Sequence, residues 1–254
     1  MGQISNKRRP IVIANWKLNG TSAFVDDLLE GITERWFGVH QAEVVVCPAF
    51  VHIAQAVNEH LAHSNIALGA QDCSQFEEGA YTGDVSAEML HDLGCQYVIV
   101  GHSERRRFYG ETDAQVAKKF DLVHQSMMTP ILCVGETPEQ RDAGKTLDVI
   151  KRQVGAALDY CGIEKLARCV VAYEPLWAVG TGVTATPDQA QQVHGFIRQL
   201  LGPVGQAVRI VYGGSVKASN AETLFAEPDI DGALVGGAAL KAEDFIDICK
   251  AAEL

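Results

Sequence analysis

Residues 97–135 read YVIVGHSERRRFYGETDAQVAKKFDLVHQSMMTPILCVG, and this order of apolar and polar segments predicts the architecture of the whole chain. A short β-branched run at 97–101 is followed by a polar segment and then by an amphipathic helical stretch at 113–125. A second β-branched run follows at 131–135. Two strands joined through a helix pair in parallel, because parallel neighbours need a long crossover connection.

The same strand, loop and helix unit recurs along the sequence. Strands are predicted at residues 11–15, 43–47, 66–71, 97–101, 131–135, 169–174, 208–212 and 232–235. Helices are predicted to follow them, for example at residues 113–125, 138–159, 187–200 and 242–251. Eight such units fit an α/β fold of the closed (β/α)8 barrel type. An open doubly wound sheet is the alternative, and the number of strands favours the barrel.

The length and the loops indicate one domain over residues 1–254. A (β/α)8 barrel commonly has about this length, and no linker or low-complexity tract divides the chain. The longest irregular stretch, residues 72–84, carries Phe76 and Tyr81. A loop this long in a compact domain usually has a function or a partner, and its aromatic side chains suggest a contact surface.

The bulk composition restricts the partners and the compartment. A formal charge of −11 argues against nucleic acid and anionic membranes, although a few local N–H groups and cations still suffice to hold a small phosphate. No apolar run approaches the roughly 20 residues of a membrane helix, and no signal-peptide pattern follows the basic N-terminus. Seven scattered cysteines without a C-x-x-C pair indicate reduced thiols. We therefore expect a cytoplasmic protein.

Chemically capable side chains follow the predicted strands. Asn15 and Lys17 come at the end of the first strand, His102 follows the fourth and Glu174 ends the sixth. Taken singly, such an acid is often a solvated loop residue, such a histidine is more often structural, and such a lysine usually lies on the surface. In a (β/α)8 barrel, however, all strand ends meet on the face that holds active sites. A base, an electrophile and a cation are thus predicted to converge.

The segment after Glu174 favours a catalytic role for that residue. Residues 175–185 read PLWAVGTGVTA, which is apolar, rich in glycine and free of charge. A fixed loop gains little by exposing Trp177, whereas a lid that closes over a ligand excludes water. We therefore predict a lid at 175–185 and expect Glu174 to be a base whose pKa is raised by desolvation.

Glycine pairs in the last two units predict a phosphate site. Gly-Gly turns at 213–214 and 236–237 precede helical stretches, and backbone N–H groups at such turns bind phosphate. A phosphate site after strands 7 and 8 recurs in barrels of this type. His52, His60 and His63 have no acid at ligand spacing in the sequence, so they are expected to lie on an ordinary helix surface and no metal site is predicted.

Five segments together resemble the signatures of the triosephosphate isomerase family, in the family's order. They are NWKLN at 15–19, GHSERR at 101–106, AYEPLWAVGTG at 172–182, YGGSV at 212–216 and LVGGA at 234–238. The resemblance extends over the chain from Ile11 onward. One departure is Ala239, where the family usually has serine, and we expect this to remove a buried hydrogen bond without affecting the chemistry.

The resemblance implies a reaction and a set of roles. The reaction is the interconversion of dihydroxyacetone phosphate and D-glyceraldehyde 3-phosphate in glycolysis and gluconeogenesis, with no cofactor and no metal. It implies Glu174 as the base, His102 and Lys17 as the groups that polarise the substrate oxygens, and Asn15 as an assisting residue. The remaining implied site residues are Gly180, Ser215, Gly236 and Gly237 at the phosphate, Glu104 beside Lys17, and Ser103 beside Glu174.

The resemblance also implies a homodimer. The loop at 72–84 is expected to contact the second subunit, with Thr82 approaching the neighbour's Asn15 and Lys17. A Schiff-base aldolase is a rival enzyme, but no lysine ends strands 4 to 8. A phosphoribosyl isomerase is a second rival. A non-catalytic sugar-phosphate-binding protein would be free to lose Glu174, His102 or Lys17, and all three are present.

Overall fold

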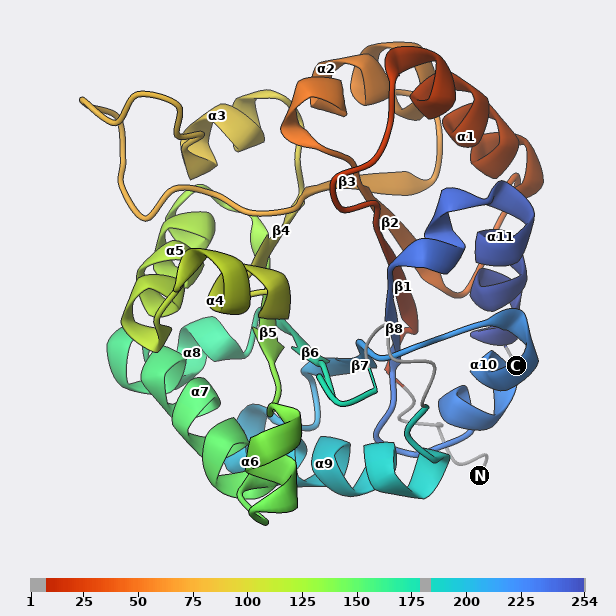
Figure 1. Ribbon diagram of the computed structural model, residues 1–254. Coiled ribbons are helices and arrows are strands. Elements are labelled where there is room, and N and C mark those ends of the chain that lie inside the picture. The colour runs from red at the N-terminus through yellow and green to blue at the C-terminus, as the bar shows by residue number, and fades with distance from the viewer. Residues whose placement is uncertain (1–7, 179–183, 254) are drawn as a thin grey trace, which may run out of the picture.

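Eight parallel strands close into one barrel within the residues that the computed structural model describes, 8–178 and 184–253. Each strand pairs with the next along the chain, and the last pairs with the first (Figure 1). The strands are β1 Ile11–Asn15, β2 Glu43–Cys47, β3 Ile66–Ala70, β4 Tyr97–Val100, β5 Thr129–Val134, β6 Val170–Tyr173, β7 Arg209–Tyr212 and β8 Gly232–Val235. The predicted barrel is confirmed, with strand ends that differ by at most two residues.

Helices surround the barrel (Figure 1). The α-helices are α1 Ser22–Arg35, α2 Ile53–Gln55, α3 Ala87–Asp92, α4 Ser103–Tyr109, α5 Asp113–Gln125, α6 Pro138–Asp142, α7 Thr146–Cys161, α8 Ile163–Leu166, α9 Pro187–Leu200, α10 Ala218–Phe225 and α11 Ala242–Ala251. Short turns of other helical types are η1 Phe50–His52, η2 Ala56–Leu61, η3 Gly202–Val204 and η4 Gly237–Leu240. The bounds predicted for α5, α9 and α11 are confirmed.

One predicted helix is wrong. The stretch 138–159 was expected to be continuous, but α6 ends at Asp142 and α7 begins at Thr146. Gly144 lies between them with φ of 67°, a left-handed conformation that ends a helix and that glycine adopts at little cost. The start of α6 follows the local sequence closely, because Thr137 caps it in a capping box with Gln140.

Alternate residues of the strands face two different cores. In β1, Ile11 and Ile13 belong to the cluster inside the barrel, whereas Val12 and Ala14 belong to the larger cluster beneath the helices. This alternation follows from the two-residue period of a strand. Since both faces are covered, the strands read as continuous apolar runs in the sequence.

A polar cluster fills the amino-terminal end of the barrel interior. Glu43, Tyr97 and Arg209 are the first residues of β2, β4 and β7. The Glu43 carboxylate accepts a hydrogen bond from the Tyr97 hydroxyl at 2.6 Å and pairs with the Arg209 guanidinium. This end is thereby filled by side chains that satisfy one another, and the opposite end carries the chemically capable residues.

The loop at 72–84 projects from the barrel ahead of α3, at the upper left of Figure 1. The rings of Phe76 and Tyr81 stack at 3.9 Å, and the Ser74 hydroxyl donates to Asp84 at 2.6 Å across the base of the loop. At that base, the buried Lys119 pairs with Asp72 at 2.8 Å. The loop therefore has internal structure and a fixed base.

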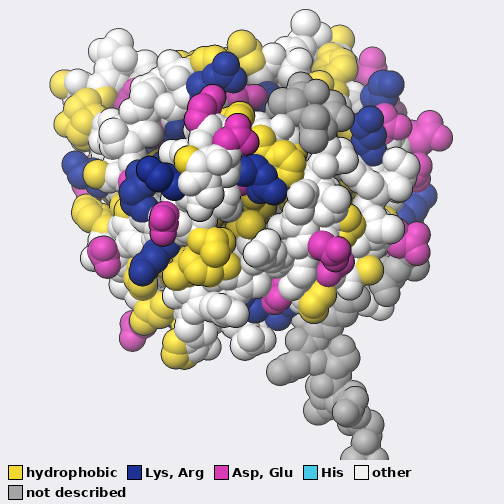
Figure 2. Space-filling model, turned by 60° about the horizontal axis from the view of Figure 1, so that its bottom comes forward, with side chains coloured by type: hydrophobic (Ala, Val, Ile, Leu, Met, Phe, Trp, Pro, Cys, Tyr) yellow, Lys and Arg dark blue, Asp and Glu magenta, His cyan; other side chains and the backbone are white. Residues whose placement is uncertain are grey.

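The surface carries charges of both signs. On the face in Figure 2, acidic and basic side chains are mixed and form no broad basic stripe. Among the described residues, no helix is both long and apolar enough to cross a membrane. All seven cysteines are free thiols; six are buried and Cys161 is partly so.

A buried histidine makes the stability of the fold depend on pH. His194 of α9 is fully buried between Tyr173 and Tyr212, and its Nδ1–H donates to the Asp229 carbonyl at 3.2 Å. Burial lowers the pKa of His194 from 6.5 to about 4. Between these values the unfolded chain binds the proton and the folded chain does not, so stability falls as the pH drops through this window.

We predict that the free energy of unfolding of the wild type falls by about 2 kcal/mol more than that of His194→Gln between about pH 6.5 and about pH 5. Urea unfolding at matched protein concentration measures the difference. His91→Gln, which alters an exposed histidine, is the control and should retain the wild-type dependence. Equal pH dependence in wild type and His194→Gln would show that the ring is not held neutral.

Candidate active site

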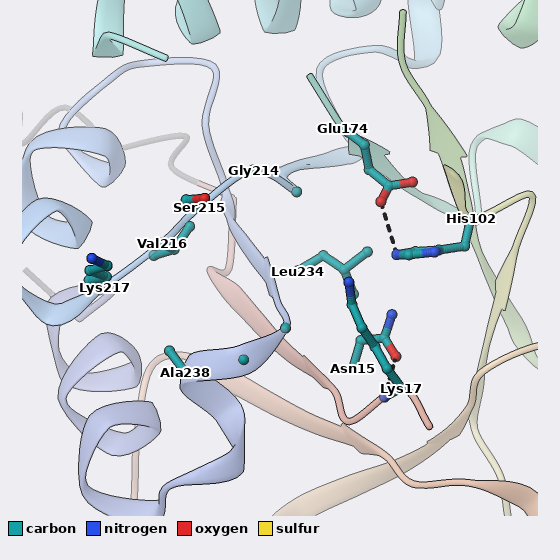
Figure 3. Close-up of a pocket in the computed structure, with 13 residues that line it drawn as sticks. Asn15, Lys17, His102, Glu174, Gly214, Ser215, Val216, Lys217, Leu234 and Ala238 are labelled. Atoms are coloured by element: carbon teal, nitrogen blue, oxygen red, sulfur yellow. Dashed lines mark hydrogen bonds and ion pairs between the residues drawn. The ribbon is translucent and has the colours of Figure 1, made fainter. Parts of the chain in front are cut away.

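The residues at the carboxyl ends of the strands enclose a cavity of about 260 Å³. Figure 3 shows Glu174 and His102 on one side of it, Asn15 and Lys17 below them, and the segment from Gly214 to Lys217 on the other side. The full lining among the described residues is Asn15, Lys17, His102, Glu174, Gly213, Gly214, Ser215, Val216, Lys217, Leu234, Gly236, Gly237 and Ala238.

Glu174 is a buried carboxylate held by three donors. Its Oε2 accepts from the Ser103 amide at 2.9 Å, and its Oε1 accepts from the Ser103 hydroxyl at 3.0 Å and lies 2.9 Å from His102 Nε2. The Ser103 amide is the first N–H of α4, where the helix dipole favours an anion. A Cβ atom on Gly213 would lie 2.8 Å from Glu174 Cγ, so the glycine leaves room for this side chain.

The surroundings of His102 indicate which ring nitrogen carries the proton. Its Nδ1 accepts the amide N–H of Glu104 at 3.3 Å, so Nε2 carries the proton and points at Glu174. Burial lowers the pKa of His102, but the carboxylate of Glu174 outweighs burial, and the pKa lies above its ordinary value. This raising effect of Glu174 arises only because folding brings the two side chains together from different strands.

The pKa of Glu174 is also set by the same contacts. Burial raises it, but His102 and Ser103 more than offset the burial, so the pKa of Glu174 lies below its ordinary value. The expectation of a raised pKa is therefore wrong for this arrangement, in which the donors compensate for the lost water. The carboxylate is ionised, as a base must be.

Lys17 is the cation that lines the cavity with Glu174 and His102. Its Nζ lies 2.6 Å from Glu104 Oε1, and its backbone has a φ of 54°, which is uncommon for a residue other than glycine. The side chains of two neighbours hold this backbone: Asn15 Oδ1 accepts the Lys17 amide at 3.1 Å, and Gln71 donates to the Lys17 carbonyl at 2.9 Å. A left-handed backbone held in this way is typical of a functional site.

The turn at Gly214 lies across the cavity from His102 (Figure 3). At Gly214 a Cβ atom would lie 2.2 Å from the Tyr212 hydroxyl, so the turn requires glycine. The Ser215 hydroxyl donates to the Ala178 carbonyl at 3.0 Å. Gly236 and Gly237 line the same cavity. Gly180 and the rest of 179–183 in the predicted lid lie outside the described residues.

Glu136 is a buried acid that sequence-based reasoning missed. Its Oε1 accepts from the Trp177 indole at 2.8 Å and from the Tyr173 hydroxyl at 3.1 Å, and Arg141 lies 3.3 Å away. Arg141 also stacks over the Trp177 ring at 3.9 Å. The indole that was expected to be exposed is therefore held by Glu136 and Arg141. The signal in the sequence was an acid just after a predicted strand, as at Glu174.

Potential metal ligands gather elsewhere. Among the described residues, Asp26, Glu59 and His60 form a group whose ligand atoms lie within 4.8 Å of one another, outside the cavity. Asp26 on α1 comes to 3.0 Å from His60 on η2, a proximity that spacing along the sequence could not reveal. His52 is buried rather than on the surface, with its Nε2 at 3.1 Å from the Gly20 carbonyl.

Comparison with known proteins assigns the family. The family model for triosephosphate isomerase matches residues 10–252. The triosephosphate isomerase of Alcanivorax borkumensis is 50% identical over 251 residues, covering 97% of this chain and 99% of the relative. That of Ectopseudomonas mendocina is 51% identical over 250 residues, covering 96% and 99%. The chain belongs to the triosephosphate isomerase family. The signatures that suggested the family in the sequence are thereby confirmed.

The family signatures meet at one cavity. Its lining includes Asn15 at the end of β1, Lys17 after β1, His102 after β4, Glu174 after β6, and the glycine turns after β7 and β8. Ser103 contacts Glu174 and Glu104 contacts Lys17, as the resemblance implied. Ala239, the departure from the family pattern, is fully buried, and its amide donates to the Gly236 carbonyl at 2.8 Å. The turn thus forms without the family's usual serine.

We predict that Glu136→Gln lowers the free energy of unfolding by about 1–3 kcal/mol, because an amide replaces an acceptor oxygen among fixed buried donors. Urea unfolding followed by Trp fluorescence provides the measurement. Glu139→Gln, three residues away and exposed, is the matched control and should lose no more than about 0.5 kcal/mol. Equal losses in both variants would contradict a special role for the buried acid.

Proposed function

We propose that the chain interconverts dihydroxyacetone phosphate and D-glyceraldehyde 3-phosphate through an enediolate, with Glu174 as the base. The reaction belongs to glycolysis and gluconeogenesis. The observation that carries the proposal is the buried carboxylate of Glu174 beside His102 in a cavity that also holds Lys17. Membership of the family supports the same activity. So does the name triosephosphate isomerase of a relative that is 50% identical over 97% of this chain.

The base needs to be ionised and then released. In the structure, Ser103 and His102 occupy the oxygens of Glu174. We propose that a substrate entering the cavity draws the carboxylate away from Ser103. The side chain then loses donors in a dry site, its pKa rises, and its affinity for a carbon-bound proton increases. Glu174 would remove a proton from one carbon and return it to the next.

The groups opposite the base would stabilise the charge that develops on oxygen. Removing a proton beside a carbonyl places negative charge on the oxygen, and fixed donors aimed at it lower the barrier. His102 Nε2–H points into the cavity and the Lys17 ammonium lies beside it, with Asn15 near both (Figure 3). When Glu174 moves, the effect that raises the pKa of His102 weakens, which favours a neutral ring.

The phosphate would occupy the opposite side of the cavity. Ser215, Gly236 and Gly237 line the cavity, and backbone N–H groups at such turns suit a small anion. We propose residues 175–185 as a lid over this side. Two contacts at its described beginning support the proposal: Trp177 with Glu136, and the Ala178 carbonyl with Ser215. A closed lid would exclude water from the enediolate.

We predict that Glu174→Gln reduces kcat by about 10²–10⁴, because a positioned general base contributes about that factor. A coupled assay of triose phosphate interconversion measures turnover. Competition by inorganic phosphate, measured on the residual activity, is the control for an intact phosphate site and should be unchanged. A kcat that stays within about tenfold of the wild type, roughly 1.4 kcal/mol of barrier, would refute the assignment.

We further propose that the working form is a cytoplasmic homodimer that uses the loop at 72–84. The projecting loop, its stacked Phe76 and Tyr81, and its fixed base support a contact role. Thr82 is exposed in the loop, and Leu18, next to catalytic Lys17, exposes 97% of its surface. A neighbour's loop that covered Leu18 would bury this apolar side chain and steady Lys17.

We predict that Thr82→Arg favours monomers and lowers turnover, because a bulky cation would be buried at the contact. A displacement of a catalytic group by about 1 Å can cost roughly 10²-fold in rate. Sedimentation at the concentration of the assay, beside activity, measures both effects. Gln206→Arg adds the same charge at another exposed position and should leave both unchanged. A monomeric, fully active wild type would contradict the dimer.

A further inference from the structure

We propose that Lys217 attracts the dianionic phosphate substrate into the cavity and thereby sets the rate of productive binding. The inference rests on the proposed function and adds a residue to it. Lys217 lines the cavity two residues after Ser215, on the side away from His102 (Figure 3). Its position is therefore beside the proposed phosphate site and distant from the base.

The charges around the cavity show why this lysine matters. Of the described lining residues, Lys17 and Lys217 are cationic and Glu174 is anionic. Lys17 is moreover paired with the carboxylate of Glu104 at 2.6 Å. Two lysines thus face two carboxylates, and with His102 neutral the group has no net charge. Without Lys217 it would carry one negative charge, which is unsuited to receiving a dianion.

Among the described residues, Lys217 is the only cation that lines the cavity without an ion-pair partner. Lys217 is exposed and forms no ion pair within residues 8–178 and 184–253, whereas Lys17 is held by Glu104. The segment 179–183, VGTGV, contributes no charge by its sequence. The ammonium of Lys217 is consequently available to an incoming phosphate.

The positive charge of Lys217 lies at a helix start, where it does not favour the stability of the fold. It is the N-cap residue of α10, and the first turn of that helix has no acidic residue. The helix dipole disfavours a cation at this end. Its backbone amide donates to Asn220 Oδ1 at 2.8 Å, so the cap is made by the backbone and Asn220 without the lysine side chain. A local conflict of this kind is expected where function requires the residue.

The charge of the whole chain strengthens the need for local attraction. At −11 the protein repels a dianion at long range, and a cavity attracts one only through its local field. Such attraction acts on the association rate and weakens as salt shortens the Debye length. The contribution of Lys217 is therefore expected to appear in kcat/KM and to depend on ionic strength.

The test compares Lys217→Gln, Lys217→Glu and Lys217→Arg with Lys118→Gln, which removes an exposed lysine of α5 that does not line the cavity. For D-glyceraldehyde 3-phosphate at about 0.02 M ionic strength, we expect Lys217→Gln to lower kcat/KM by about three- to fivefold and Lys217→Glu by about tenfold. Lys217→Arg, which keeps the positive charge, should retain the wild-type kcat/KM. At about 0.3 M the differences should shrink below about twofold, with kcat little changed throughout.

Thermal unfolding separates this role from a structural one. The Tm of Lys217→Gln should equal or exceed that of the wild type, since the variant removes a cation from a helix start. A loss of kcat/KM that is the same at both ionic strengths, or no larger than that of Lys118→Gln, would overturn the inference while leaving the isomerase intact. A wild type without turnover would instead overturn the proposed function.

Discussion

The contact between the Glu174 carboxylate and the first residues of α4 governs the arrangement of the site. Glu174 follows β6, and Ser103 and His102 follow β4, so β5 lies between them in the barrel. At the end of β5, a Cβ atom on Gly135 would lie 1.8 Å from the Glu174 carbonyl oxygen. The contact therefore needs a closed barrel of fixed register. It also needs a glycine at position 135, because the backbone of Glu174 passes too close for a side chain there.

Burying a carboxylate is costly, and the structure meets the cost with donors. Burial alone would raise the pKa of Glu174, yet Ser103 and His102 reverse the direction. The same donors are those that a substrate would have to displace. A base that is stabilised as an anion at rest and loses its donors on binding can be ionised before the reaction and strongly basic during it.

The sequence predicted what depends on local pattern and on strand ends. The alternation of apolar runs and helices indicated the barrel, and the common edge of parallel strands placed Asn15, Lys17, His102 and Glu174 together. Contacts across elements were not predictable in the same way. The bonds of Glu136 to Trp177, and the reversal of the Glu174 pKa, depend on side chains brought together only by folding. The break at Gly144 depended on one left-handed residue.

Isotope exchange with solvent tests most directly whether a carboxylate transfers the proton through an enediolate. D-glyceraldehyde 3-phosphate is converted in D2O, and the dihydroxyacetone phosphate formed is analysed by proton NMR. Since a proton held by Glu174 exchanges with solvent in part before it returns to carbon, we expect a measurable fraction of the product to carry deuterium at C1. Product free of solvent deuterium at C1 would indicate direct hydride transfer between the carbons and would contradict the account.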